Sequence, residues 1–318
     1  MKLYMAPMEG LTGYIYRQAF GRYFGGADKV FTPFIAAEGS RSMKNKEIKD
    51  IAPENNKGLY TVPQIISNNA DNFVRFARLI EERGYEEINI NLGCPSGTVV
   101  SKGKGSGMLG DTDKLDSFLD KVYGALPDMK VSVKTRIGLK DPEECMKILK
   151  VYNRYPIHEL IVHPRIREDV YKGSPRMEYF SCIYENSLNP VCYNGDIKNV
   201  ADYEEITEKY HKLQAVMIGR GLIRNPAILK SISSHESGPE YVVDKQTLRM
   251  FHDDIYNAYK SYLEQEKIIL FKMKEIWCFM IDLFADNEKY FKMLKKSDNL
   301  RNYNIFVNKI FYEADLNP

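Results

Sequence analysis

The chain has 318 residues and a mass of 36.8 kDa, enough for one large domain and a smaller one, and its hydrophobic fraction of 44% is ordinary for a protein with a packed core. Its formal net charge of +2 neither requires nor excludes a nucleic-acid partner. The five cysteines are odd in number and follow no C-x-x-C or Cys/His metal spacing. We therefore expect no metal site, no secreted disulfide framework and a reducing, cytoplasmic location.

No membrane association is expected either. No apolar run approaches the roughly 18 residues that a membrane helix needs. The apolar run at the N-terminus is too short for a signal peptide and soon meets Pro7 and Glu9.

Strand and helix patterns alternate over the first two thirds of the chain. Eight short segments have the apolar or alternating pattern of a strand, namely residues 2–6, 30–35, 61–66, 87–91, 131–136, 159–163, 191–194 and 215–219. Helical periodicity lies between them, in residues 12–24, 71–84, 112–126, 141–155, 178–185 and 200–212. The connection 36–58 is polar and irregular, and no clear helix is expected there.

This alternation predicts an α/β fold, a parallel (βα)8 TIM barrel, with a doubly wound open sheet as the alternative. Residues 243–316 contain no Gly and no Pro, and their apolar positions recur at helical spacing. They predict a small all-helical C-terminal domain. The predicted domains are therefore a barrel over residues 1–235 and a helical domain over residues 240–318, with the Ser-, Gly- and Pro-containing segment 231–239 as the linker.

The segment 87–110 combines a strand end with a cysteine and a glycine-rich loop. Pro95 stops the fourth strand and leaves Cys94 on the loop just beyond it, where a thiol can reach a ligand. The glycines that follow allow the loop to hinge, and Lys102 and Lys104 offer positive charge to a polyanion. A buried structural thiol is the alternative interpretation of Cys94.

The last two strand ends carry residues suited to a phosphate. Asn194, Gly195 and Asp196 follow the seventh strand, and Gly219 and Arg220 follow the eighth. Small residues let backbone N–H groups approach a phosphate, and an arginine adds a charge-assisted bond. Ordinary turn glycines are the alternative.

Lys134 is a charged residue inside an otherwise apolar strand. A cation there is costly unless it meets an anion or an electron-rich ligand, and a flavin qualifies because a cation near its N1/O2 edge stabilises the reduced ring. Gln64 can donate to and accept from the pyrimidine edge of the same ring. Alternatively, Lys134 forms an ion pair with Glu87 or Asp196, and His163 is an ordinary core histidine.

A set of short segments, in order along residues 1–230, resembles the tRNA-dihydrouridine synthases. They are Ala6-Pro-Met-Glu-Gly10, Asn91-Leu-Gly-Cys-Pro-Ser96, Gly105-Ser-Gly-Met-Leu109, Val131-Ser-Val-Lys-Thr-Arg136, Val162-His-Pro-Arg165, Tyr193-Asn-Gly-Asp196 and Met217-Ile-Gly-Arg220. The resemblance implies a bacterial FMN enzyme that takes hydride from NADPH and reduces a uridine in the D-loop of tRNA, with the helical tail as an RNA-binding domain.

By matching position, the resemblance assigns a role to each candidate residue. Cys94 would protonate C5 of the uracil as general acid while hydride passes from the flavin to C6. Asn91 and Arg136 would hold the uracil. FMN would be bound by Pro7, Met8, Glu9, Gln64, Lys134, His163, Asn194, Gly195, Asp196, Gly219 and Arg220. The uridine must leave its stack, so a deep pocket with a positive surround is expected.

The tail carries further signals. Segment 289–301 interleaves basic and aromatic residues, as an RNA-binding surface would, and a solvated helix face is the alternative. The opening motif and the tail around Lys274 and Trp277 resemble the bacterial branch that modifies the 5′ side of the D-loop.

Two other functions stay open at this point. A flavin barrel that reduces a free pyrimidine, similar to the dihydroorotate dehydrogenases, would not require the helical tail. A tRNA-binding folding factor that works without reduction would not require Cys94. Nothing in the sequence demands more than a monomer, and it does not decide which uridine, which tRNA or which nicotinamide cofactor is used.

Overall fold

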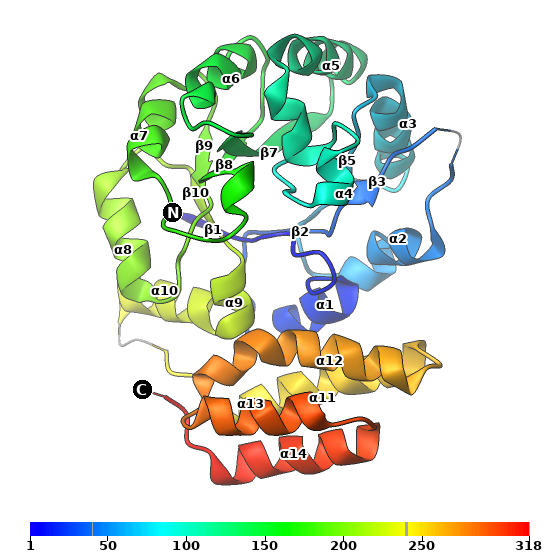
Figure 1. Cartoon of the computed structure of the whole chain (residues 1–318), viewed down its shortest axis with the longest axis vertical. Helices are drawn as coiled ribbons and strands as arrows, with labels where there is room; N and C mark the ends of the chain where they lie inside the picture. The colour runs from blue at the N-terminus through cyan, green and yellow to red at the C-terminus, as the bar shows by residue number, and fades with distance from the viewer. Residues whose placement is uncertain (40, 239–240, 318) are drawn as a thin grey trace.

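A parallel barrel with a block of helices packed below it makes up the protein (Figure 1). The computed structural model describes residues 1–39, 41–238 and 241–317. The strands are β1 (Lys2–Met5), β2 (Lys29–Phe31), β3 (Ile35–Ala36), β4 (Thr61–Val62), β5 (Gln64–Ile66), β6 (Glu87–Leu92), β7 (Lys130–Gly138), β8 (Leu160–Ile166), β9 (Val191–Tyr193) and β10 (Ala215–Ile218). All pair in parallel, in the order β3-β5-β6-β7-β8-β9-β10-β1-β2-β4.

Two of the predicted strands are each broken into two short ones. β2 and β3 are separated around Pro33, and β4 and β5 are separated by Pro63, because proline has no N–H to give to a ladder. β2 pairs with β4 and β3 pairs with β5, while β5 also pairs with β6. The segment 61–66 thus has neighbours on both sides and closes the sheet, so the predicted TIM barrel is confirmed.

The register of the central strands points a set of polar side chains into the barrel. Asn91 is paired with Lys134, and Arg136 with His163. Paired residues on parallel strands share a face, and residues two apart on one strand do too. All four side chains therefore face the barrel interior near the carboxyl ends of the strands.

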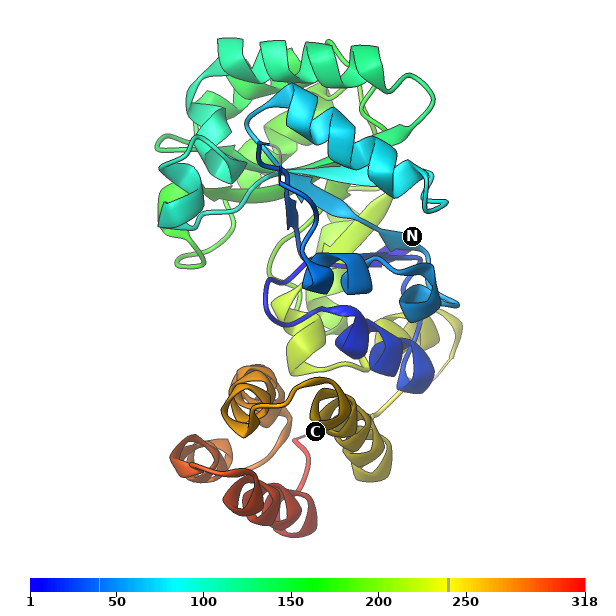
Figure 2. The same cartoon turned by 90° about the vertical axis from the view of Figure 1, so that its right-hand side faces the viewer.

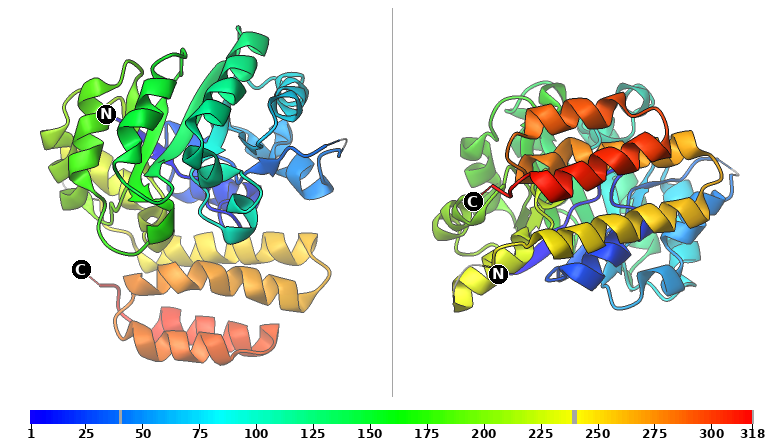
Figure 3. Two further views of the ribbon diagram at one scale, coloured as in Figure 1. Left: turned by 45° about the horizontal axis from the view of Figure 1, so that its top comes forward. Right: turned by 90° about the horizontal axis from the view of Figure 1, so that it is seen from below.

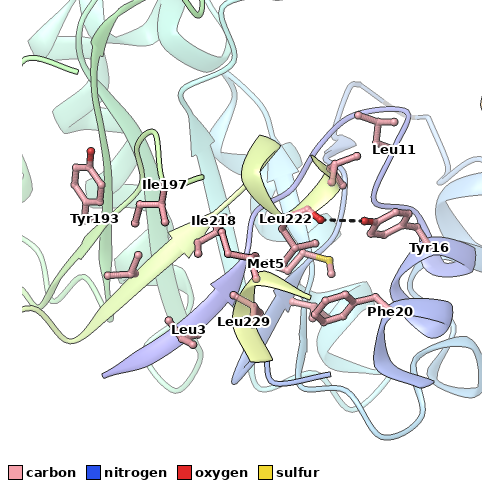
Figure 4. Close-up of a cluster of buried hydrophobic side chains, with 14 of the residues drawn as sticks. Leu3, Met5, Leu11, Tyr16, Phe20, Tyr193, Ile197, Ile218, Leu222 and Leu229 are labelled. Atoms are coloured by element: carbon pink, nitrogen blue, oxygen red, sulfur yellow. Dashed lines mark hydrogen bonds between the residues drawn. The ribbon is translucent and has the colours of Figure 1, made fainter. Parts of the chain in front are cut away.

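Helices cover the outside of the barrel, as Figures 1 and 2 show. The helices that follow the strands in the expected way are α1 (Tyr14–Tyr23), α3 (Ala70–Glu81), α5 (Thr112–Ala125), α6 (Glu144–Tyr152), α7 (Met177–Asn186) and α8 (Val200–Lys209). Shorter ones are α4 (Gly97–Val100), α9 (Arg220–Arg224) and the 3-10 turns η2 (Gly105–Gly110) and η3 (Arg167–Asp169). Met5, Tyr16, Phe20, Leu222 and Leu229 pack together where the last strand meets the first helix (Figure 4).

Two expectations about the connections are wrong. Segment 36–58 contains α2 (Asn45–Asp50) and the 3-10 turn η1 (Pro53–Asn56). The Glu47 side chain caps the start of α2 by accepting from the Lys44 backbone N–H at 2.7 Å, and a tertiary contact holds its end, because Asp50 pairs with the buried Arg17 at 3.3 Å. The predicted linker 231–239 is helical through α10 (Ile228–Ser237), and residue 239 lies outside the described residues.

The predicted helical C-terminal domain is confirmed. It consists of α11 (Lys245–Tyr262), α12 (Glu266–Met280), η4 (Ile281–Leu283), α13 (Asn287–Lys296) and α14 (Leu300–Glu313). Its core centres on the buried Tyr303, whose hydroxyl lies 2.8 Å from the Trp277 indole nitrogen and 2.7 Å from His252 Nε2. Phe251 of α11 packs edge-on against Tyr16 of α1, which docks the domain under the barrel (Figure 3). None of the described helices is long and apolar enough to cross a membrane.

Candidate active site

A cavity of about 300 Å³ opens at the carboxyl ends of the barrel strands, and all of the predicted site residues line it. These are Pro7, Met8, Glu9, Gln64, Asn91, Cys94, Lys134, Arg136, His163, Asn194, Gly195, Asp196, Gly219 and Arg220. Residues that come from seven strand ends thus converge in one place, as a barrel requires. The role of each residue remains a prediction.

An internal chain of side-chain amides holds the floor of the cavity. The Asn91 side-chain nitrogen donates to the Gln64 oxygen at 2.7 Å, and the Gln64 nitrogen donates to Asn89 at 2.8 Å. Asn89 in turn donates to the Ser132 hydroxyl at 2.9 Å. Because each amide bonds to the next, their orientations are fixed before any ligand arrives.

The Cys94 loop is held from both sides. Asn91 Oδ1 accepts hydrogen bonds from the Gly93 and Cys94 backbone N–H groups at 3.1 and 2.9 Å, and the Ser106 hydroxyl donates to the Cys94 carbonyl at 2.8 Å. Gly105 has a φ of +56°, and a Cβ there would lie 2.9 Å from that carbonyl. Burial raises the pKa of the half-buried thiol, so Cys94 is protonated at neutral pH.

Arg136 ties the Cys94 loop to the loop after β8. Its guanidinium donates to the carbonyl oxygens of Gly93 at 2.9 Å, Ile166 at 2.8 Å and Val170 at 2.6 Å. Burial, together with the charge of Arg165, lowers its pKa to about 10. Of its five N–H groups, two make no hydrogen bond within the described part of the chain and stay available to a ligand.

Lys134 is a cation without an acidic partner. Among residues 1–39, 41–238 and 241–317, no carboxylate lies within 4.0 Å of its ammonium group. Glu87 pairs with Lys29 at 2.8 Å and Asp196 with two arginines, so the proposed ion pair of Lys134 with either carboxylate does not form. Burial lowers the pKa of Lys134 to about 8, and the nearby Arg136 adds to this. Such a group favours an anionic or electron-rich ligand.

His163 is neutral, and its tautomer is set by a neighbour. Arg165 Nη1 lies 3.0 Å from His163 Nε2, and arginine can only donate. Nε2 is therefore the acceptor, and the ring proton sits on Nδ1. Burial and then the charge of Arg136 hold the pKa of His163 well below its usual value, which agrees with this assignment.

Asp196 acts as a clamp on two arginines at the end of the cavity formed by β9 and β10. It accepts from Arg165 at 3.0 and 2.6 Å and from Arg220 at 2.6 Å. Burial raises its pKa, but the bonds from Arg165 and Arg220 outweigh it, so the net pKa is lowered. At Gly195, a Cβ would lie 2.0 Å from the Tyr193 hydroxyl, so only glycine fits and its backbone faces the cavity without a side chain.

Comparison with known proteins adds a decisive match. The sequence pattern of the family described as dihydrouridine synthase (Dus) covers residues 4–313. The chain belongs to the dihydrouridine synthase family. The family predicted from the sequence motifs is therefore confirmed.

Named relatives agree with this membership, and a solved structure shares the fold. The tRNA-dihydrouridine synthase B of Pasteurella multocida is 29% identical over 73% of this chain and 69% of its own length. The tRNA-dihydrouridine(16) synthase of Neisseria meningitidis is 25% identical over 95% of this chain and 93% of its own. Morphinone reductase, solved in complex with tetrahydroNAD, shares the fold with a TM-score of 0.52, covering 77% of this chain and 89% of its own at 12% identity.

Sequence reasoning gave no role to Arg165, although a matched motif contains it, and did not single out Tyr171; both shape the site of this family member. Arg165 is fully buried and holds both His163 and Asp196. Tyr171 lines the cavity, and its ring lies 5.6 Å from the Arg136 guanidinium and 4.6 Å from that of Arg220. Arg165 is the last residue but one of β8, and Tyr171 lies in the irregular loop that follows this strand. The run of charged residues after His163 is the signal that could have drawn attention to this segment.

Glu9 lies at the rim of the cavity rather than deep within it. Its side chain is 53% exposed and 3.7 Å from Lys46, so it is in contact with solvent. The backbone N–H of Met8 donates to the Thr12 hydroxyl at 2.8 Å, which fixes the position of Met8 in the loop after β1. Phe34 and Pro33 also line the cavity, and sequence reasoning assigned them to a continuous strand.

Proposed function

We propose that the protein is an FMN-dependent tRNA-dihydrouridine synthase, which reduces the C5–C6 double bond of a D-loop uridine with NADPH as reductant. One observation carries the proposal: the unpaired cation of Lys134 and the protonated thiol of Cys94 line the same cavity at the strand ends. A cation and an acid that line one cavity suit hydride transfer followed by protonation.

The residues of the cavity fit a flavin mononucleotide. Lys134 would hold the electron-rich edge of the isoalloxazine ring, and its ammonium group, whose pKa burial lowers to about 8, would be stabilised in the charged form there. Gln64 has the donor and acceptor that the pyrimidine edge needs. Gly195 and Gly219 carry no side chain where a phosphate would approach the backbone, and Arg220 supplies the opposite charge.

The protein's own groups supply the acid–base part of the reaction. The bound flavin supplies hydride, received from NADPH, to C6 of the uracil. The Cys94 Sγ–H group gives its proton to C5, which is possible because burial keeps the thiol protonated. The nearby charges of Arg136 and Lys134 lower the pKa of Cys94 in opposition to burial, so they stabilise the thiolate that remains. Asn91 and Arg136 hold the uracil.

Transfer RNA lies across both domains in this proposal, with the barrel over residues 1–235 and the helical domain over residues 240–318. The basic side chains of α13 are exposed and support an RNA contact there. Lys274 and Trp277 have internal roles instead: the Lys274 ammonium donates to the Ser297 carbonyl at 2.5 Å, and Trp277 is fully buried. The protein acts as a cytoplasmic monomer, and all five of its cysteines are free.

The test begins with an absorption spectrum of the purified protein, reconstituted with FMN where necessary. NADPH and NADH oxidation and dihydrouridine formation in unmodified tRNA are then compared for wild type, Cys94→Ala and Cys182→Ala, whose thiol is exposed. We expect flavin absorption in all three, and a loss of dihydrouridine of about 100-fold or more in Cys94→Ala only, as for a general acid.

Each alternative function has its own outcome. A protein that cannot bind FMN contradicts the redox function and leaves an RNA-binding barrel. Reduction of a free pyrimidine without any product on tRNA favours an enzyme similar to dihydroorotate dehydrogenases. Full function of Cys94→Ala in cells, with normal tRNA folding, favours a folding factor.

A further inference from the structure

A second cavity, of about 420 Å³, lies at the junction of the barrel and the helical domain. Residues of α1, α2, α11 and α12 line it. Glu9, Pro33 and Phe34 line both this cavity and the active-site cavity, so a single layer of side chains separates the two. We call it the junction cavity.

The wall of the junction cavity is aromatic and aliphatic. Tyr14, Tyr259 and Tyr262 contribute rings, and Tyr14 meets Tyr262 edge-on with ring centroids 6.2 Å apart. Ile15 and Ile268 add aliphatic surface. Flat rings of this kind accept the face of another planar ring without sequence-specific hydrogen bonds.

Lysines surround this apolar wall. Lys44, Lys46 and Lys272 line the cavity, and the Lys49 ammonium lies 4.4 Å above the Tyr262 ring. No carboxylate of the described residues lies within salt-bridge distance of Lys44 or Lys49.

The three carboxylates of the wall already have cationic partners. Asp50 pairs with Arg17 at 3.3 Å and Glu9 with Lys46 at 3.7 Å. Glu47 of α2 pairs with Arg41, which precedes that helix. Two lysines therefore remain free to meet a polyanion at the rim of the cavity.

We propose that the junction cavity receives the base of the tRNA nucleotide next to the reactive uridine. This inference rests on the proposed function. Once a uridine enters the active site, its neighbour is bound to it through one phosphate and must lie close to the shared wall at Pro33 and Phe34. A tyrosine-lined cavity stacks that base, and Lys44 and Lys49 lie on the path of the phosphates.

Tyr262→Ala tests the stacking surface, and Lys44→Gln is a second variant that removes a charge and keeps all three tyrosine rings. Their affinity for tRNA is measured with transcripts that carry one abasic nucleotide at each D-loop position in turn. Tyr312→Ala is the matched control, because this tyrosine is 88% exposed on α14 and lines neither cavity. The nucleotide reduced by the wild type is mapped in parallel.

We expect Tyr262→Ala to weaken tRNA binding about tenfold, within the range for loss of base stacking. An abasic nucleotide beside the reduced uridine should weaken the binding of tRNA to the wild type about as much. The same abasic nucleotide should weaken binding to the Tyr262→Ala variant little further, because both changes remove the same contact. Lys44→Gln should weaken binding of all transcripts alike and reduce its salt dependence.

The outcomes separate this inference from the proposed function. If the wild type forms dihydrouridine, but the losses of tRNA affinity from Tyr262→Ala and from an abasic nucleotide add at every position, the junction cavity is not a base site. The proposed enzyme function then stays intact. Coupling between Tyr262 and one position, without any dihydrouridine formed by the wild type, supports the cavity and contradicts the function. A rise in KM for NADPH alone in Tyr262→Ala overturns the inference and assigns the cavity to the adenosine of the reductant.

Discussion

The unpaired charge of Lys134 should lower the free energy of unfolding of the flavin-free protein. The difference between its ordinary pKa of 10.5 and about 8 corresponds to about 3 kcal/mol, by which the folded protein disfavours the charged form. Lys134→Met keeps the unbranched chain and removes the charge. In flavin-free protein at pH 6.5, we therefore expect the variant to have a free energy of unfolding up to about 3 kcal/mol higher than the wild type.

The pH dependence of this difference follows from the sign of the shift. The pKa of Lys134 is lower in the folded than in the unfolded protein, so the wild type becomes more stable as the pH rises from about 8 to 10.5. The advantage of Lys134→Met should be full below pH 8 and shrink above it. Urea unfolding of flavin-free proteins at pH 6.5, 8 and 9.5 measures this directly.

Two controls frame the measurement. Lys104 is a buried lysine that pairs with Glu38, so Lys104→Met should lower the free energy of unfolding. With FMN present, the order of wild type and Lys134→Met should reverse, because the cofactor binds only the wild type tightly. A flavin-free Lys134→Met protein that is less stable than the wild type at every pH would refute the idea that this charge awaits an electron-rich ligand.

Further predictions concern the end of the cavity formed by β9 and β10. Gly195→Ala should abolish FMN binding and lower the melting temperature, because its Cβ would lie 2.0 Å from the Tyr193 hydroxyl, whereas Gly124→Ala, with nothing within 4 Å, should raise stability by up to about 1 kcal/mol. Thermal melts with and without FMN measure both effects, and equal melting temperatures and FMN-induced shifts for the two variants would contradict this prediction. Asp196→Asn should destabilise the protein at pH 7; since the pKa of Asp196 is lowered, the gap to wild type should close as pH falls through that pKa, and a gap unchanged at pH 3 would be the contrary result.

Much of the barrel could be predicted because each strand carries its own local signal. Residues 131–136 have the pattern of a strand with Lys134 inside it, so both the strand and the need of this lysine for an anionic or electron-rich partner follow from the sequence. The breaks at Pro33 and Pro63 were equally visible, since proline cannot give an N–H to a ladder, but their consequence depends on the partner strand. Helix α2 was missed because it is only six residues long and depends in part on a distant contact, the pair of Asp50 with Arg17.

The site was predictable in its members but less so in their contacts. Strand ends of a parallel barrel always meet, so residues as distant as Cys94 and Arg220 could be assigned to one cavity. The ion-pair partner of each charged residue depends on the tertiary structure and not on the local sequence. Asp196 was predicted to bind the cofactor, which stays a prediction, and the bonds of its oxygens to Arg165 and Arg220 could not be predicted from the sequence. The loop that carries Tyr171 has no regular period, so no pattern placed it over the cavity.

The distribution of acids inside the barrel explains why the cavity is positive. At the amino-terminal end of the strands, Lys29 donates to Glu87 at 2.8 Å, and Glu159 accepts from the Tyr4 hydroxyl at 3.0 Å. Both of these inward carboxylates therefore have bonding partners at that end of the barrel. An apolar layer that includes Ile161, Cys192 and Met217 lies between them and the cavity.

The same separation leaves the carboxyl-terminal end of the barrel short of negative charge. Asp196 is shared by Arg165 and Arg220, while Lys134 and Arg136 have no carboxylate within salt-bridge distance among the described residues. The apolar layer keeps the lower acids from reaching them. An anionic cofactor relieves this imbalance, so we expect FMN to bind before tRNA and tRNA affinity to depend on FMN; filter binding with and without FMN measures it, and equal affinities would contradict this order.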